Sequence, residues 1–413
     1  MKTPSKEKVL DAIEKLNKLD GVLYAFPDFE ISAASSDINY NTNQIDTSPS
    51  DIYSLISLNQ AWNSVSNLSQ NTVRVAVIDS GIDKNHSALR GKIDESTSAN
   101  LIGYVGDDYD DFDEYVGSAP IDNNGHGTHV AGIIAASLDS ETGMKGVCPS
   151  VELISIKVLD DRGTGDFSDL VAAMAYVASL DDTSDEIDIV NISIEAKDFF
   201  TQETNQELLG TWITDYDGLV ICAAGNSNYD LDQVNIFPAS IDGNRIITVG
   251  ASDSNDTRWY SSEEDGSNHS GSVDIFAPGV DIVSCIASGS TGISCPGDSC
   301  ASTAHITDGY HALTGTSMAA PFVTGVAALM LSVNSSLNAE DIKDAITSTE
   351  NVDYSTHSSD PIYELYNICA SGGRLNAYKA VSAVLETDTP EEPETCMHES
   401  TYYLTDSLTH TLY

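Results

Sequence analysis

One serine stands where a nucleophile would be well placed. Ser317 lies in the stretch Gly315-Thr316-Ser317-Met318-Ala319-Ala320-Pro321, directly before a segment that is apolar on every face. Such a segment predicts a fully buried helix, and a proline in its first turn costs no helical hydrogen bond. Ser317 is therefore expected at the amino end of a core helix. A serine hydroxyl is a weak nucleophile at neutral pH, so chemistry here requires an adjacent base and a group that orients it.

Two residues are suited to those tasks. Asp79 ends an apolar run that starts at Val73, so it is expected at the carboxyl end of a strand, where an aspartate also commonly caps a turn. His126 opens a segment of small and apolar residues that predicts a buried helix. His126 and His129 could alternatively bind a metal, but a zinc-protease helix carries His-Glu-x-x-His, and this segment lacks that spacing and the glutamate.

A fourth polar residue follows another apolar run. Asn226 comes directly after Val220–Gly225, so its side-chain amide could donate to a developing negative oxygen at a strand end. Its alternative role is that of a turn asparagine in left-handed geometry. Each of these stretches is ambiguous when taken singly.

Taken together, the four stretches resemble the subtilisin-like serine proteases, or subtilases. The aspartate, histidine, serine order is that of subtilisin itself. The resemblance spans about residues 51–385 and implies that Ser317 attacks a peptide carbonyl, His126 exchanges the proton and Asp79 holds the imidazole. It also implies that Asn226, with the Ser317 backbone N–H, binds the oxyanion, and that the chemistry needs no cofactor.

The remaining pattern predicts the elements that position these residues. Strands alternating with helices imply a parallel sheet covered on both faces, which is an α/β architecture and matches the three-layer subtilisin-like fold. The predicted strands are Val73–Asp79, Val151–Leu159, Ile187–Ile194, Leu219–Gly225 and Ile246–Gly250, and the predicted helices lie near 125–138, 166–180, 203–216, 338–348 and 374–385.

The amino-terminal segment is expected to be a separate unit. A helix over 5–20 and a strand over Val22–Ile31 resemble the carboxyl half of a subtilase inhibitory propeptide, so residues 1–31 are expected to act as an intramolecular inhibitor. The polar stretch 32–50 predicts an exposed linker that holds the maturation site. Residues 51–385 are the expected catalytic domain, 386–395 an acidic linker, and 396–413 the start of a truncated module or a tail.

The resemblance also indicates the substrate cleft. Substrate-binding residues are expected at Ser193, Ile194 and Glu195, and at Ala223, Ala224 and Gly225. Glu195 stands where the family usually has a glycine, in Ser-Leu-Gly-Gly. A solvent-facing side chain is one interpretation; the other is that Glu195, with Asp230 and Asp232, favours basic side chains in the substrate.

Calcium is a possible structural ligand. The family's frequent His-Pro-Asp-Leu is His86-Ser87-Ala88-Leu89 here, so one carboxylate is missing from that site. A second candidate is the acidic loop before the histidine motif, with Asp107, Asp110 and Asp113, because closely spaced carboxylates suit a hard cation. A solvated acidic loop is the alternative.

Composition limits the partners. The net charge of −46 argues against nucleic acid and against an anionic membrane surface. No window is expected to span a membrane, and residues 1–20 lack the apolar core of a signal peptide. Proteins or peptides are the expected substrates of a protein that is expected to be a monomer.

The cysteines bear on the compartment. Cys148 and Cys222 are expected to be core thiols. The insertion over 283–313 is expected to be a disulfide-tied surface loop through Cys295 and Cys300, and a zinc site is the lesser alternative. The insertion also carries Cys285, His305 and His311. These features favour a secreted or cell-surface enzyme. An intracellular subtilase and a catalytically inactive, peptide-binding relative are the alternatives.

Overall fold

The computed structural model describes residues 12–13, 15–16, 18–19, 25, 28–34, 48–104, 112–140, 143–197, 210–213, 215–290, 305–307, 309–354, 365 and 368–385. Its helices are α2 (Pro49–Leu55), α3 (Leu58–Val65), α4 (His126–Ala135), α5 (Phe167–Ala178), α7 (Thr316–Val333), α8 (Ala339–Thr347) and α9 (Ala377–Leu385). Its strands are β1 (Glu30–Ala33), β2 (Arg74–Asp79), β3 (Ala99–Asn100), β4 (Glu152–Lys157), β5 (Thr164–Asp166), β6 (Ile189–Ile192), β7 (Ile194–Lys197), β8 (Leu219–Ala223), β9 (Ile236–Phe237), β10 (Ile246–Ser252), β11 (Tyr260–Ser262), β12 (Asp265–Gly266), β13 (Ile275–Pro278), β14 (Ile282–Cys285), β15 (His305–Thr307) and β16 (Tyr310–Leu313).

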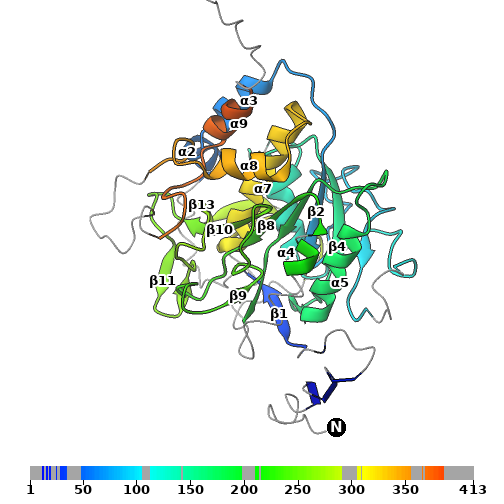
Figure 1. Ribbon diagram of the computed structural model, residues 1–413. Coiled ribbons are helices and arrows are strands. Elements are labelled where there is room, and N and C mark those ends of the chain that lie inside the picture. Colours follow the sequence, from blue (N-terminus) through cyan, green and yellow to red (C-terminus); the bar gives the residue numbers. More distant parts are fainter. Residues whose placement is uncertain are drawn as a thin grey trace, which may run out of the picture.

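A seven-stranded parallel sheet forms the middle layer. Its strand order is β13-β10-β8-β6-β2-β4-β3, and each neighbouring pair runs parallel. Alternate residues of β2 face opposite layers: Val75 and Val77 belong to the core with α4 and α7, whereas Ala76 and Ile78 belong to the core with α5. The predicted α/β fold with helices on both faces is therefore confirmed (Figure 1).

The predicted elements match the structure with small shifts at their ends. Most differences are one to three residues, which is the ordinary scatter of element boundaries. Two differences are larger. The strand predicted over Val22–Ile31 is wrong at its start, because the described residues Ala25, Asp28 and Phe29 are not in a strand and β1 begins at Glu30. The run predicted as a single strand over Ile187–Ile194 is divided, because β6 ends at Ile192 and β7 begins at Ile194 as part of a different sheet. The predicted helix near 203–216 falls largely outside the described residues.

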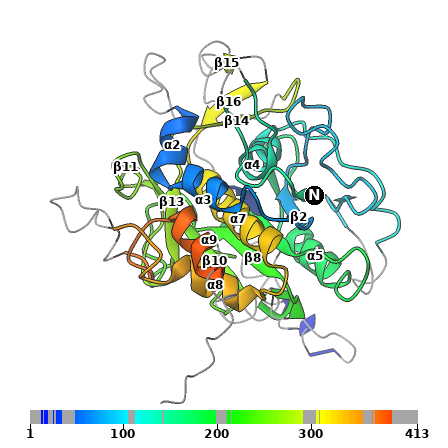
Figure 2. The same cartoon turned by 90° about the horizontal axis from the view of Figure 1, so that it is seen from above.

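Helix α7 crosses the centre of the molecule (Figure 2). It is 18 residues long with a mean hydropathy of 1.6, so the expectation that no segment is long and apolar enough to span a membrane is wrong by length and composition. However, 94% of this window is buried inside the protein, as expected of a core helix. The apolar faces of α7 therefore pack against the sheet and the neighbouring helices.

The linker predicted over 32–50 has regular structure at both ends and is buried at its amino end, while Ser48 and Ser50 at the other end are exposed. Ser32 and Ala33 continue strand β1, and Ala34 is fully buried. At the other end, Ser48 caps α2 by accepting from the Asp51 N–H, while the Asp51 side chain accepts from the Ser48 N–H. Composition did not indicate these contacts because they are tertiary or depend on a specific cap geometry.

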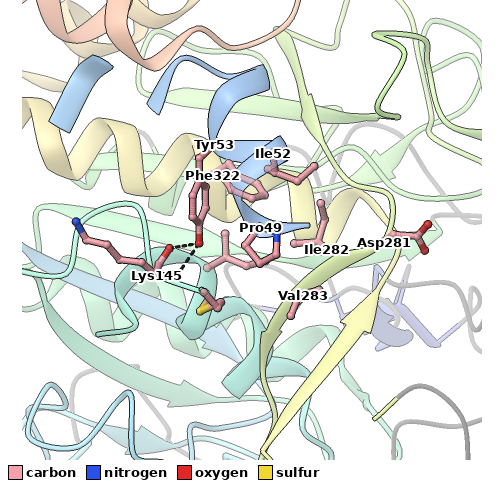
Figure 3. A pocket seen from close by; sticks show the side chains of 10 residues that line it. Pro49, Ile52, Tyr53, Lys145, Asp281, Ile282, Val283 and Phe322 are labelled. Carbon is pink, nitrogen blue, oxygen red and sulfur yellow. Dashed lines mark hydrogen bonds between the residues drawn. The ribbon is translucent and has the colours of Figure 1, made fainter. Parts of the chain in front are cut away.

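Helix α2 is fixed to the domain by Tyr53. The Tyr53 hydroxyl donates to the Lys145 carbonyl and accepts from the Lys145 N–H, each at 2.7 Å. Figure 3 shows Tyr53 beside Phe322 of α7 and next to a cavity of about 10 Å³, which is close to the smallest volume that holds one water molecule. Helix α2 is thus packed on the domain.

Candidate active site

Asp79 and His126 form a buried hydrogen-bonded pair. Asp79 is the last residue of β2, and His126 is the first of α4. The His126 Nδ1 lies 2.8 and 2.9 Å from the two Asp79 carboxylate oxygens. A Cβ on the following residue, Gly127, would lie 2.2 Å from the carbonyl oxygen of Gly81, so only glycine allows this approach.

This pair has the properties of a base and its orienting acid. Burial lowers the pKa of His126, but the charge and hydrogen bond of Asp79 outweigh burial, so the pKa is raised above its ordinary value. The other imidazole nitrogen, Nε2, is buried and has no hydrogen-bond partner in the described part of the chain. It is therefore available to accept a proton.

Ser317 is the second residue of α7 and is fully buried. Its hydroxyl donates to the Ser193 carbonyl at 3.1 Å, and the Ser193 hydroxyl donates to the Ser317 carbonyl at the same distance. Among the described residues, no hydrogen bond joins the Ser317 Oγ to His126. Proton transfer to His126 thus requires rotation of this hydroxyl, and catalytic hydrogen bonds commonly tighten only during the reaction.

The side chain of Asn226 is held through its amide oxygen. Its Oδ1 accepts from the Thr316 N–H at 3.0 Å and from the Thr316 hydroxyl at 2.9 Å. The Thr316 hydroxyl in turn accepts from the Gly225 N–H at 3.0 Å. The Asn226 Nδ2 is buried and has no partner in the described structure, so it can donate to a developing oxyanion.

Strand β1 lies beside these residues, between β5 and β7, and the space between β5 and β7 is here called the groove. Strand β1 pairs antiparallel with β5 on one side and with β7 on the other, and Figure 1 shows it as the blue arrow at the edge of the domain. The Ala34 carbonyl accepts from the Ser317 N–H at 3.0 Å, and the Ala34 N–H donates to the Ser193 carbonyl at 3.1 Å. The Ala34 carbonyl therefore lies where a scissile carbonyl would be polarised, at the positive end of α7.

Comparison with known proteins agrees with this geometry. A family model described as the subtilase family matches residues 70–375. The chain belongs to the subtilase family. It is 32% identical over 374 residues to the thermophilic serine proteinase of Bacillus sp. (strain AK1), covering 90% of this chain and 75% of that protein.

Two further relatives are named as a subtilisin and as an intracellular serine protease. Subtilisin DY of Bacillus licheniformis is 32% identical over 280 residues, covering 67% of this chain and 83% of the relative. The intracellular serine protease of Paenibacillus polymyxa is 32% identical over 260 residues, covering 62% of this chain and 66% of the relative. The subtilase is a serine endopeptidase, and its catalysis needs no cofactor.

The residues predicted to bind substrate differ in their contacts. Ser193, Ile194 and Glu195 lie directly beside the bound segment, since Ala33 pairs with Ile194 and Ser32 with Glu195. Ala223 ends β8 of the central sheet and pairs with β10, and the N–H of the next residue, Ala224, donates to the Val249 carbonyl of β10 at 2.9 Å. Gly225 lies between the sheet and Asn226, with its N–H on Thr316.

Glu195 has a contact that the sequence did not indicate. Its Oε2 accepts from the Asn226 N–H at 3.0 Å, so the side chain turns inward across the groove rather than toward solvent. Asp230 accepts from the Asp232 N–H, and Asp232 accepts from the Ser272 hydroxyl at 3.0 Å. Charge selection by these three carboxylates stays a prediction.

The second edge of the groove was missed. The sequence pointed only to the edge at Ser193, but Ala33 donates to the Gly163 carbonyl at 3.0 Å and β1 pairs with β5. The pair Gly163 and Gly165 around Thr164 is the signal that could have indicated this edge. A Cβ on Gly165 would lie 2.1 Å from the Val158 carbonyl oxygen.

Asp122 is a second residue that the sequence did not single out. Its carboxylate accepts from the Ser80 hydroxyl at 3.0 Å, the Gly125 N–H at 2.7 Å and the Thr128 hydroxyl at 2.6 Å. It therefore fixes the turn that leads into His126. Its signal is an acid four residues before the histidine, followed by the turn formers Asn123 and Asn124.

Of the three residues predicted to bind calcium, one lies in the described part of the chain. Asp107 and Asp110 lie outside the described residues, and Asp113 is exposed. Within the described ranges, no group of three or more His, Cys, Asp or Glu side chains could hold a metal. At the other candidate site, the His86 Nε2 lies 2.8 Å from the Gly309 carbonyl oxygen, so this ring is engaged with the backbone.

The insertion before Ser317 begins and ends as a hairpin. Strand β14 pairs antiparallel with β16, and Cys285 at the end of β14 is a buried free thiol. Placing Cys285 in a surface loop was therefore wrong, because this position packs into the core. Cys148 and Cys222 are buried free thiols as predicted, whereas Cys295 and Cys300 lie outside the described residues.

Proposed function

We propose that this endopeptidase uses Ser317 as nucleophile, His126 as general base and acid, Asp79 as the orienting acid and Asn226 as an oxyanion donor. Ser317 Oγ attacks the carbonyl carbon while its proton passes to His126 Nε2. His126 then protonates the leaving amine, and a water molecule hydrolyses the acyl-enzyme. The observation that carries this assignment is the buried Asp79–His126 pair, with an unpartnered Nε2, next to a helix start that presents Ser317.

Active-site labelling tests the assignment. A fluorophosphonate should label the processed enzyme once per chain, and Ser317→Ala should abolish labelling. Ser332→Ala is the matched control, because Ser332 is also buried on α7 but bonds within its own helix, to the Leu329 carbonyl. Unlabelled processed protein, or labelling that survives Ser317→Ala, would support the inactive peptide-binding alternative.

We also propose that the chain is a self-inhibited precursor that cuts itself between Ala34 and Ser35. Support comes from the two-sided pairing of β1 and from the Ser317 N–H on the Ala34 carbonyl. The pairing blocks other substrates until the segment leaves. The cut would fall inside the range 32–50 predicted from the sequence, at its buried end.

Two further proposals concern calcium and the location of the enzyme. Structural calcium remains a prediction for the acidic loop with Asp113, and a chelator titration that leaves Tm unchanged would exclude it.

A secreted or surface location is favoured by the precursor organisation, although one relative is named as intracellular. Detection of the processed form in the culture medium, and its absence from the cell interior, tests the location.

A further inference from the structure

We infer that Glu195 restricts the residue before the cleaved bond to a small side chain such as alanine, glycine or serine. This inference rests on the proposed function, because it assumes that β1 lies in the groove as a substrate does. It concerns the space next to Ala34, the residue whose carbonyl lies on the Ser317 N–H.

The register of β1 determines where the Ala34 methyl group lies. Ser32 stands directly opposite Glu195, and opposed residues of an antiparallel pair project to the same face. Ala34 directly follows β1, and its N–H still bonds to the Ser193 carbonyl, so the alternation of the strand continues and Ala34 projects to the side of Ser32 and Glu195. Ile31 and Ala33 project to the other side, where Ile31 is fully buried in the core around α5.

The Glu195 side chain occupies the space on that face. It leaves β7 beside the bound segment and reaches the backbone of Asn226, which follows the wall residue Gly225. The Glu195 carboxylate therefore links β7, which pairs with β1, to the turn at Asn226, whose side chain lies on Thr316 next to Ser317. Ala34 is itself fully buried, so its methyl group has no open space beyond it.

Three side chains fill the space beside Gly225 and form a wall there. A Cβ built on Gly225 would lie 2.7 Å from the Glu195 Oε2, 2.5 Å from the Asn268 Nδ2 and 3.3 Å from the Ile236 side chain. Asn268 is fixed because its Nδ2 donates to the Ala224 carbonyl at 2.7 Å and its Oδ1 accepts from two backbone N–H groups. Ile236 is fully buried in β9, so Glu195 is the part of this wall that can move.

A larger side chain at the position of Ala34 would have to displace the Glu195 carboxylate from the Asn226 N–H. That breaks a hydrogen bond to a charged group and disturbs the residue whose amide faces the oxyanion. We expect such substrates to react roughly tenfold more slowly or worse in kcat/KM. Shortening Glu195 should remove the restriction.

Peptide anilides of sequence Ile-Ser-Ala-X, which copy residues 31–34 with X as Ala, Phe or Lys, test this directly. The wild-type enzyme should prefer Ala over Phe by about tenfold or more in kcat/KM. Glu195→Gly should lower this ratio by about tenfold, whereas Glu195→Gln, of the same length, should keep it. Glu350→Gly is the matched control, since Glu350 is exposed beyond α8 and its loss should leave the ratio unchanged.

The outcomes separate this inference from the proposed function. Active enzyme is first counted by fluorophosphonate labelling of Ser317. Absence of labelling and of all hydrolysis contradicts the proposed function. Normal labelling with equal rates for Ala and Phe, or an unchanged ratio in Glu195→Gly, overturns only the role of Glu195. A preference for Lys that disappears in Glu195→Gln overturns it too, because Glu195 would then select charge rather than size.

The rate of self-cleavage of the full chain is a second measurement, and it tests the inference even if Glu195→Gly fails to fold. Ala34→Phe should slow processing by about tenfold or more, and Ala34→Ser should not. Combining Ala34→Phe with Glu195→Ala should restore processing, because the shortened side chain leaves room for the ring. Processing of Ala34→Phe at the wild-type rate would contradict the inference, whatever the folding of the Glu195 variants.

Discussion

Removing the side-chain amide of Asn226 should lower kcat far more than it changes KM. The Asn226 Nδ2 is buried without a partner among the described residues, while Oδ1 is held by two bonds from Thr316. The amide therefore costs no reorganisation when negative charge develops on the substrate oxygen. In Asn226→Ala only the Ser317 N–H remains as a donor.

The expected loss follows from the type of donor removed. One oxyanion donor in a water-excluded site is worth roughly 100- to 1000-fold in kcat, the range known for the donor of subtilisin, or about 2.7–4 kcal/mol. Thr316→Val should cost less in kcat, roughly 2- to 13-fold, because it removes one of the two neutral bonds that hold the Asn226 Oδ1 and leaves the Thr316 N–H on that oxygen. The bond from the Gly225 N–H to the Thr316 hydroxyl is lost as well.

Steady-state hydrolysis of a peptide anilide measures both effects. We expect unchanged KM, a large fall of kcat in Asn226→Ala and a smaller one in Thr316→Val. Asn255→Ala, at an exposed surface turn, is the control and should leave both constants unchanged. A fall of less than tenfold in Asn226→Ala, or a loss confined to KM, would refute the assignment of Asn226 to the oxyanion.

Three further predictions concern the base, the precursor and the packing of α2. Asp79 raises the pKa of His126, and the base must be neutral, so activity should fall as the pH drops through that raised pKa. In a pH–rate profile, Asp79→Asn should move this acidic limb to lower pH and strongly reduce kcat. An acidic limb that stays in place would contradict the Asp79–His126 pairing. Ser317→Ala should keep the precursor at full mass by mass spectrometry, and a processed product in this variant would mean that another protease makes the cut. Tyr53→Phe removes the bonds to Lys145 and should lower the free energy of unfolding by about 1 kcal/mol per bond. Urea denaturation measures this change. An unchanged denaturation midpoint would show that these bonds do not contribute to stability.

The sequence was informative where chemistry requires fixed residue types. Asp79, His126, Asn226 and Ser317 are each ambiguous by position, and the resemblance of their four stretches to the subtilases assigns their roles. The structure places Asp79 against His126 and Asn226 against the start of α7. The order of these motifs also indicated the three-layer fold.

The sequence was uninformative where tertiary pairing decides. Ser32 and Ala34 belong to a polar stretch whose composition predicts a linker, yet β5 and β7 order them in the groove. Glu195 was recognised as a departure from the family, but its bond to Asn226 depends on a fold that brings distant strands together. Cys285 was assigned to a loop because the hairpin that buries it closes with residues far along the chain.

The amino terminus of the purified enzyme tests the central claim most directly. Peptide sequencing or mass spectrometry should find a wild-type chain that begins at Ser35 and a Ser317→Ala chain that retains the Ala34–Ser35 bond. A wild-type chain cut at another bond, or the same terminus in both proteins, would contradict the account of β1 as the bound and self-cleaved segment.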